Sequence, residues 1–257
     1  VGYSALDANT TASNNTAVGR SALGTNTTGT QNTVVGSLAA DASDADNVTA
    51  FGYGALTDNT TGSDNNAFGA ACLANNTTAT RNNAFGTSAM QTNTTGQYNC
   101  AFGYAALFAN TTASYNSAFG HLALTANTTG TQNVGVGAFA GDAITTGNYN
   151  VAVGYNALTT SATADRNTAI GQSALKLNTT GSNNTAVGQG ALNDNTTGDD
   201  NTAVGSGALD ANTTGTYNTA FGRSALTNLT TASNNVAVGR VAMEAATTAY
   251  NNVAVGT

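Results

Sequence analysis

Glycine returns at a fixed interval along the whole chain, and this repeat restricts the fold more than any other feature. From Gly2 to Gly256, fourteen of fifteen successive intervals are 17 residues long, and the interval 36–52 is 16. Counted from its glycine as position 1, each unit reads G-x-x-A-L-x-x-N-T-T-[GA]-x-x-N-x-A-[VF]. A fixed period of this kind is the signature of a repeat architecture in which each unit stacks on the next.

A coil of two short strands fits this unit better than a pair of helices. Common helical repeats need about 33 residues or more, and the apolar pairs Ala-Leu and Ala-[Val/Phe] lack helical spacing. Asn, Thr and Gly are also poor helix formers. We therefore predict an all-β fold, a parallel β-solenoid of about 15 coils forming one repeat domain over residues 1–257. Strands are expected at positions 14–17 and roughly 3–6 of each coil, with like residues stacked about 4.8 Å apart.

The apolar pairs predict a continuous apolar ribbon on the surface of the solenoid. Adjacent residues on a strand point to opposite faces, so either Ala lines the interior and Leu with Val/Phe faces outward, or the reverse. Both arrangements leave a continuous apolar ribbon, which monomers rarely expose. We therefore predict lateral association of identical chains. The residues predicted to form this seam or the core are Leu6, Val18, Leu23, Val35, Phe51, Leu56, Phe68, Leu73, Phe85, Phe102, Leu107, Phe119, Leu124, Val187, Leu192, Val204, Leu209, Phe221, Leu226 and Val238.

Asparagine is the most regular polar residue of the repeat. It occupies position 14 in fourteen coils and position 8 in ten. Stacked Asn side chains can form amide ladders along the axis of a repeat. The predicted stacking ladder of position 14 comprises Asn15, Asn32, Asn65, Asn82, Asn99, Asn116, Asn133, Asn150, Asn167, Asn184, Asn201, Asn218, Asn235 and Asn252.

Two coils are irregular, at 36–51 and 137–153. Coil 36–51 lacks the Leu, the Thr pair and the Asn of position 14, and it gains Asp41, Asp44 and Asp46. Three carboxylates on one tight turn could hold a hard cation such as Ca²⁺. Their spacing matches no standard loop, so we favour a local bulge or deletion and expect no metal or cofactor. Coil 137–153 is expected to mark a bend.

The composition argues against several classes of function. Charged residues make up 7% of the chain and there is one His, whereas acid–base and metal chemistry draw on such residues. Six basic residues against 13 acidic ones leave no basic surface for nucleic acid. Apolar runs are only a few residues long, too short to span a membrane. The chain is therefore not expected to be an enzyme, a nucleic-acid binder or a membrane-inserted protein.

The motif N-x-A-[VF]-G followed by x-x-A-L, as in 15–23 and 184–192, resembles the head repeat of YadA-type trimeric autotransporter adhesins. It is even more similar to repeats of phage tail-fibre-like proteins that carry a C-terminal self-cleaving chaperone domain. The resemblance covers the entire chain, although the adhesin repeat is shorter and lacks the Thr-Thr-Gly segment. It implies a left-handed parallel β-roll, three chains around one axis and a location outside the cell. Both ends lie inside the repeat, so we expect a segment of a longer fibre.

A few isolated residues are weaker candidates for a site. Cys72 and Cys100 fall in different columns and are expected to stay unpaired, and His121 is expected on the solvated surface. Surface residues of position 2 could form a file that recognises a partner. That file includes Arg20, Tyr53, Tyr104, Tyr155, Arg223 and Arg240.

The leading hypothesis is a structural extracellular fibre segment, an adhesin head or tail-fibre shaft on a cell surface or virion. Its chains would associate as a homotrimer and present a surface for attachment to a cell-surface or glycan receptor. The alternative is a monomeric solenoid that binds ice or another surface through its Thr columns. A third reading, a polysaccharide depolymerase, needs paired carboxylates in a groove, and the acidic residues here are scattered.

Overall fold

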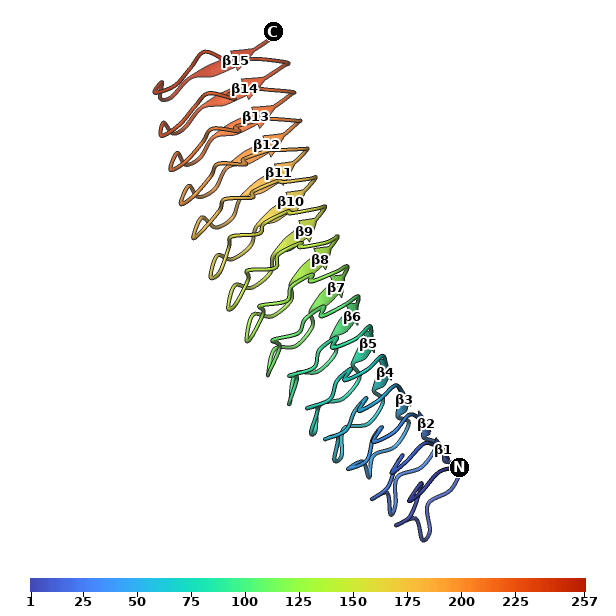
Figure 1. Ribbon diagram of the computed structural model, residues 1–257. Coiled ribbons are helices and arrows are strands. Elements are labelled where there is room, and N and C mark those ends of the chain that lie inside the picture. The colour runs from blue at the N-terminus through green and yellow to red at the C-terminus, as the bar shows by residue number, and fades with distance from the viewer. The chain divides into compact units, whose positions relative to one another are not determined.

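A computed structural model describes residues 1–257 as stacked coils, each with one short strand (Figure 1). The chain divides into two compact units, Val1–Thr129 and Gly130–Thr257. Within each unit, every strand pairs in parallel with the strand of the neighbouring coil. The predicted all-β parallel solenoid is therefore confirmed for each unit. No helix long and apolar enough to cross a membrane is present.

The strands are three residues long and recur once per repeat. In the first unit they are β1 (Thr16–Val18), β2 (Thr33–Val35), β3 (Thr49–Phe51), β4 (Asn66–Phe68), β5 (Asn83–Phe85), β6 (Cys100–Phe102) and β7 (Ser117–Phe119). In the second unit they are β8 (Val134–Val136), β9 (Val151–Val153), β10 (Thr168–Ile170), β11 (Thr185–Val187), β12 (Thr202–Val204), β13 (Thr219–Phe221), β14 (Val236–Val238) and β15 (Val253–Val255).

Each strand covers positions 15–17 of its coil and pairs in the register that the repeat predicts. Ala67 of β4 lies opposite Ala84 of β5, and Phe68 lies opposite Phe85. The alanine of position 16 is buried, and the residues on either side of it point outward. The small alanine lets the opposite wall of the coil approach closely, which keeps the interior thin.

The prediction of a second strand at positions 3–6 is wrong. The backbone there forms a turn in which residues of positive and negative φ alternate. Ser173 and Leu175, at positions 3 and 5, have φ values of +57° and +50°. The Leu175 N–H donates to the Ala191 carbonyl of the next coil at 3.0 Å. The Ser173 N–H donates to the Tyr155 backbone carbonyl of the preceding coil at 3.0 Å. The turn thus pairs its amides between coils, as a strand would, without extended geometry.

This turn decides which apolar column fills the interior, and the answer is neither of the two arrangements considered above. Because positions 4 and 5 do not alternate as on a strand, both Ala174 and Leu175 are fully buried. The left-handed conformation disfavours a leucine by roughly 1–2 kcal/mol, which burial of the side chain offsets at a similar magnitude. The Leu residues of position 5 therefore form the core, although Leu6 of the first coil is only half-buried. The Val and Phe residues of position 17 alone form the outward ribbon.

The asparagines of position 14 lie inside the coils and connect each coil to the next. The Asn184 side chain accepts the backbone N–H of Asn201 at 3.0 Å and donates to the Gly198 carbonyl at 2.8 Å. The same pair of bonds recurs at Asn65, whose partners are Asn82 and Ala79. These amides therefore satisfy backbone groups that the short strands leave unpaired.

A second ladder runs through the asparagines of position 8. The Asn195 amide donates to the Asn178 side-chain oxygen at 2.8 Å, and the Asn212 amide donates to that of Asn195 at 2.8 Å. Position 8 of the following coil is Leu229, which is fully buried. The side-chain oxygen of Asn212 consequently has no hydrogen-bond partner. The ladder stops where the sequence replaces the amide.

Candidate functional site

The position-17 ribbon of the first unit is an outward stack of phenylalanines. Rings of neighbouring coils lie nearly parallel from β3 to β7, with centroids 4.4–5.1 Å apart. Phe51 and Phe102 are 36% exposed and Phe119 is 41% exposed. In the second unit the same column holds mainly Val and Ile, with Val136, Ile170 and Phe221 exposed. The remaining predicted seam residues of position 17 are half-buried or exposed: Val18, Val35, Phe68, Phe85, Val187, Val204 and Val238.

The residues beside the phenylalanine stack are small and mostly polar. Asn66 donates to the Asn83 side-chain oxygen at 2.8 Å, so position 15 carries its own short amide ladder. Cys100 follows in this column and is half-buried. Cys72 is buried in the alanine column, where its thiol donates to the Ala84 carbonyl at 3.2 Å and desolvation raises its pKa to about 12. Both cysteines are free.

The three aspartates of the short coil serve as hydrogen-bond acceptors. The Asp44 carboxylate accepts the backbone N–H groups of Thr27 at 2.8 Å and Thr28 at 2.6 Å. It also accepts the N–H of Gly29 and both threonine hydroxyls. Asp46 accepts the N–H and hydroxyl of Thr30, and the Asp41 carbonyl accepts those of Thr25. No group of three His, Cys, Asp or Glu residues is placed to hold a metal.

A missing residue explains the position of Asp44. In regular coils the first threonine of the pair donates its N–H to the same residue of the next coil, as Thr60 does to the Thr77 carbonyl at 2.9 Å. Coil 36–51 is one residue short and has a single residue, Asp44, where the pair would stand. A carboxylate offers about four acceptor positions. It therefore replaces the carbonyl acceptor that the deletion removes.

Asp44 should make the free energy of unfolding of the first unit depend on pH in the acid range. Partial desolvation works to raise its pKa, but the N–H groups of Thr28, Thr27 and Gly29 and the Thr27 hydroxyl outweigh this and hold the pKa well below 3.8. A lowered pKa contributes stability that is fully present above the unfolded value and is lost as pH falls through the folded value. We expect Asp44→Asn to destabilise the unit by about 2 kcal/mol at neutral pH, and the difference to shrink below pH about 3.8.

Urea unfolding of both proteins from pH 7 to pH 2, with amide hydrogen exchange at Thr27 and Thr28, measures this difference. Asp58→Asn is the control, because no side-chain hydrogen bond holds its carboxylate and the residue is exposed. A gap between wild type and Asp44→Asn that stays constant down to pH 2 would contradict the assigned role.

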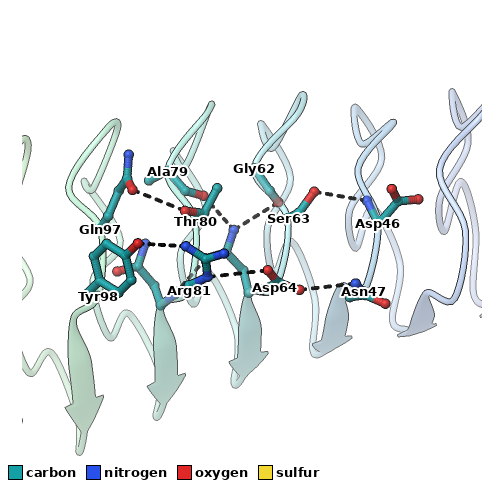
Figure 2. Close-up of polar contacts among 12 residues, drawn as sticks. Asp46, Asn47, Gly62, Ser63, Asp64, Ala79, Thr80, Arg81, Gln97 and Tyr98 are labelled. Carbon is teal, nitrogen blue, oxygen red and sulfur yellow. Dashed lines mark hydrogen bonds and ion pairs between the residues drawn. The ribbon is translucent and has the colours of Figure 1, made fainter.

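A polar file follows position 13 and was not anticipated as a connected network (Figure 2). Asn47 donates to Asp64 at 3.1 Å, and the Arg81 guanidinium lies 3.7 Å from the same carboxylate. Arg81 also donates to the Tyr98 hydroxyl at 2.6 Å and lies 5.5 Å from its ring centroid. The Tyr98 ring stacks on Tyr115 at 5.1 Å. These side chains satisfy one another, and because the ion pair is exposed its contribution to stability is small.

The predicted position-2 file is on the surface, as the sequence indicates. Tyr53, Tyr104 and Tyr155 are 64%, 55% and 52% exposed. His121 is exposed and stacks on Tyr104 with ring centroids 5.4 Å apart. The three arginines Arg20, Arg223 and Arg240 are also exposed.

The paired threonines divide into a bonded column and an exposed column. The hydroxyl of Thr94 donates to the Thr111 carbonyl at 3.0 Å, and that of Thr60 donates to Thr77 at 2.9 Å. The threonines of position 10, such as Thr61 and Thr95, are exposed. In these regular pairs one hydroxyl thus stabilises the turn and the other faces water, whereas both hydroxyls of Thr27 and Thr28 bond to Asp44.

Comparison with known proteins gives no family for this chain: no protein-family model matches it, and no curated protein matches it. The structure contains no pocket. The outward columns of positions 2, 10, 13 and 17 are therefore the features from which a function can be inferred.

Proposed function

We propose that the protein is a structural module of an extracellular fibre whose chains associate laterally, as a homotrimer, through the position-17 ribbon. The observation that carries this proposal is the outward stack of Phe51, Phe68, Phe85, Phe102 and Phe119. Five rings in one unbroken column form an apolar strip of a kind that monomers rarely leave in water. Association outside the cell is also what the resemblance to adhesin heads and tail-fibre repeats implies.

A second copy of the chain is the occupant that this strip suits best. The ribbon repeats with the spacing of the coils, so a parallel copy meets it with one apolar residue per coil. With roughly 200 Å² per phenylalanine, the five rings expose roughly 300–400 Å² in the first unit. A stable interface buries about 800 Å² per partner. The Val and Ile column of the second unit supplies further area of the same chemistry.

The proposed role is mechanical. Within each unit, coils bond to their neighbours through strand amides and left-handed turns, and most of them also through one or both asparagine ladders. Bending or extending such a unit breaks many hydrogen bonds together. Lateral association adds to this resistance, and the outward columns that remain free present a surface for attachment.

Charge placed in the ribbon should separate the chains. We expect the wild-type protein to have three times the 25.3 kDa chain mass in light scattering, and the double variant Phe85→Asp, Phe102→Asp to have the mass of one chain. Two carboxylates facing their own copies would lose the apolar contact and repel each other.

The matched control is Thr78→Asp, Thr95→Asp, which places the same charges on the exposed position-10 column of the same two coils. It should keep the mass of the wild type. A wild-type protein of single-chain mass at micromolar concentration would overturn lateral association. Dissociation of the control would overturn the assignment of the interface to the position-17 ribbon.

Ice binding through the threonines remains the second candidate, favoured by the exposed file of position 10. A single file gives a narrow surface, because the hydroxyls of position 9 already bond to the backbone. We therefore prefer the fibre. Thermal hysteresis from a protein of single-chain mass would reverse this preference.

A further inference from the structure

Exposed tyrosines recur in the first unit at every third coil. Tyr3, Tyr53 and Tyr104 occupy position 2 of the first, fourth and seventh coils, 50 and 51 residues apart, the shorter interval containing the 16-residue coil. They are 82%, 64% and 55% exposed, more than the phenylalanines of the same unit. Three coil steps of about 4.8 Å place successive rings about 14 Å apart. We call these three residues the tyrosine row.

The side chains of position 2 between Tyr53 and Tyr104 are short. Position 2 holds Ala70 and Thr87 in the two coils between Tyr53 and Tyr104, and the neighbouring column of position 1 is glycine. Tyr53 stacks on no other ring, and Tyr104 stacks on His121 of the next coil with ring centroids 5.4 Å apart. By contrast, Tyr98 of position 13 has Arg81 over its ring and Tyr115 stacked on it. Tyr53 and Tyr104 therefore stand apart from each other with only short side chains between them, whereas the longer side chain of Arg20 lies between Tyr3 and Tyr53.

The chemistry of the row favours a polymer that carries both apolar faces and hydroxyl groups. A tyrosine combines an apolar ring with a polar tip that donates and accepts hydrogen bonds. Pyranose rings of a polysaccharide present C–H faces for stacking and hydroxyls for bonding, and they repeat at a fixed interval. Arg20 is the one cation at position 2 of the first unit, no charged residue lies at position 2 between Tyr53 and Tyr104, and the net charge of the chain is −7, which disfavours an acidic polymer.

We propose that Tyr3, Tyr53 and Tyr104 bind a linear, uncharged polysaccharide that runs along the coils and contacts one ring every three coils. This inference deepens the attachment role proposed above by naming its ligand class. It does not require lateral association, because the row belongs to a single chain and is separated from the ribbon by the glycine column.

Affinity electrophoresis in gels containing hydroxyethyl cellulose, dextran or galactomannan tests the proposal, with alginate as the acidic polymer and gelatin as the protein polymer. We expect at least one uncharged polysaccharide to retard the protein, and Tyr53→Ala and Tyr104→Ala each to weaken binding roughly three- to tenfold. Alanine is tolerated at position 2, where Ala70 and Ala138 already stand. Oligosaccharides of the retarding polymer should bind much better once they are long enough to reach two rings.

The matched control is Tyr98→Asn, which removes an exposed tyrosine from the position-13 file and installs the residue found there at Asn47. It should bind as the wild type does. Retardation by none of the three uncharged polymers, retardation only by alginate or gelatin, or equal binding by wild type and both alanine variants would overturn the proposal.

The Phe85→Asp, Phe102→Asp variant separates this proposal from lateral association. If that variant has single-chain mass and still binds oligosaccharide with wild-type affinity per chain, the tyrosine row acts alone, as inferred. If binding disappears together with association, the row as a single-chain site is wrong while the fibre proposal stands. If the wild type has single-chain mass and binds, the fibre proposal fails and the row stands.

Discussion

Replacing Gly171 with alanine should lower the free energy of unfolding of the second unit by about 3–5 kcal/mol. Gly171 has φ +130°, which L-residues rarely adopt. A Cβ there would lie 2.6 Å from both the carbonyl carbon and oxygen of Gly188 in the next coil. The Gly171 N–H is bonded to the Val153 carbonyl at 2.8 Å, so the backbone cannot move away without breaking the stack. Urea unfolding followed by circular dichroism measures the loss.

Gly190→Ser is the matched control for this substitution. Gly190 also has a positive φ, +63°, but a Cβ there meets only the Asp210 carboxylate, at 3.7 Å. Ser173 stands at the equivalent position of the preceding coil with φ +57°. The control should therefore stay within about 1 kcal/mol of the wild type. Equal losses in the two variants would show that positive φ, and not the contact between coils, sets the requirement for glycine at position 1.

The same contrast shows how much of the fold the sequence could predict. The period of 17 predicted the coil and its parallel register, because stacking places like residues together, but it left open whether alanine or the larger apolar residue of each pair faces the interior. It did not give the turn at positions 3–6. Leu175 is a poor residue for a left-handed conformation when considered alone, and only its burial and its bond to Ala191 in the next coil stabilise it there. A local propensity argument therefore predicts a strand.

The surface features also divide into those that the repeat predicts and those that depend on contacts between coils. The outward file of position 2 follows from residue type and repeat, because Tyr and Arg recur there. The repeat also predicts an apolar ribbon, but only the structure shows that position 17 forms it. The role of Asp44 depends on which donors the preceding coil leaves unpaired, which is a property of two coils together. A signal was nevertheless present: the chain loses one residue of a Thr-Thr pair and gains a carboxylate at the same point. The position-13 network of Asp64, Arg81 and Tyr98 likewise needs the register between coils.

Asn184→Ala should destabilise the second unit by about 3 kcal/mol or more. The side chain is fully buried and is the acceptor for the Asn201 N–H at 3.0 Å and the donor to the Gly198 carbonyl at 2.8 Å. Alanine would leave both backbone groups buried without these partners, at about 1–3 kcal/mol each. It would also leave a cavity in a close-packed interior. Urea unfolding gives the total, and hydrogen exchange at the Asn201 amide should accelerate more than exchange in distant coils of the same unit.

The neighbouring substitution Asn183→Ala isolates the effect of burial, because Asn183 is exposed and lies in the left-handed turn of position 13 with φ +59°. Its loss removes only the preference of asparagine for that conformation, so we expect less than about 1 kcal/mol. A large difference between the two variants would mean that the coils are joined chiefly through buried amides that substitute for missing strand bonds. Similar small losses in both would instead assign the cohesion of the unit to the leucine core and the three-residue strands, and the repeated asparagine of position 14 would then be a turn residue only.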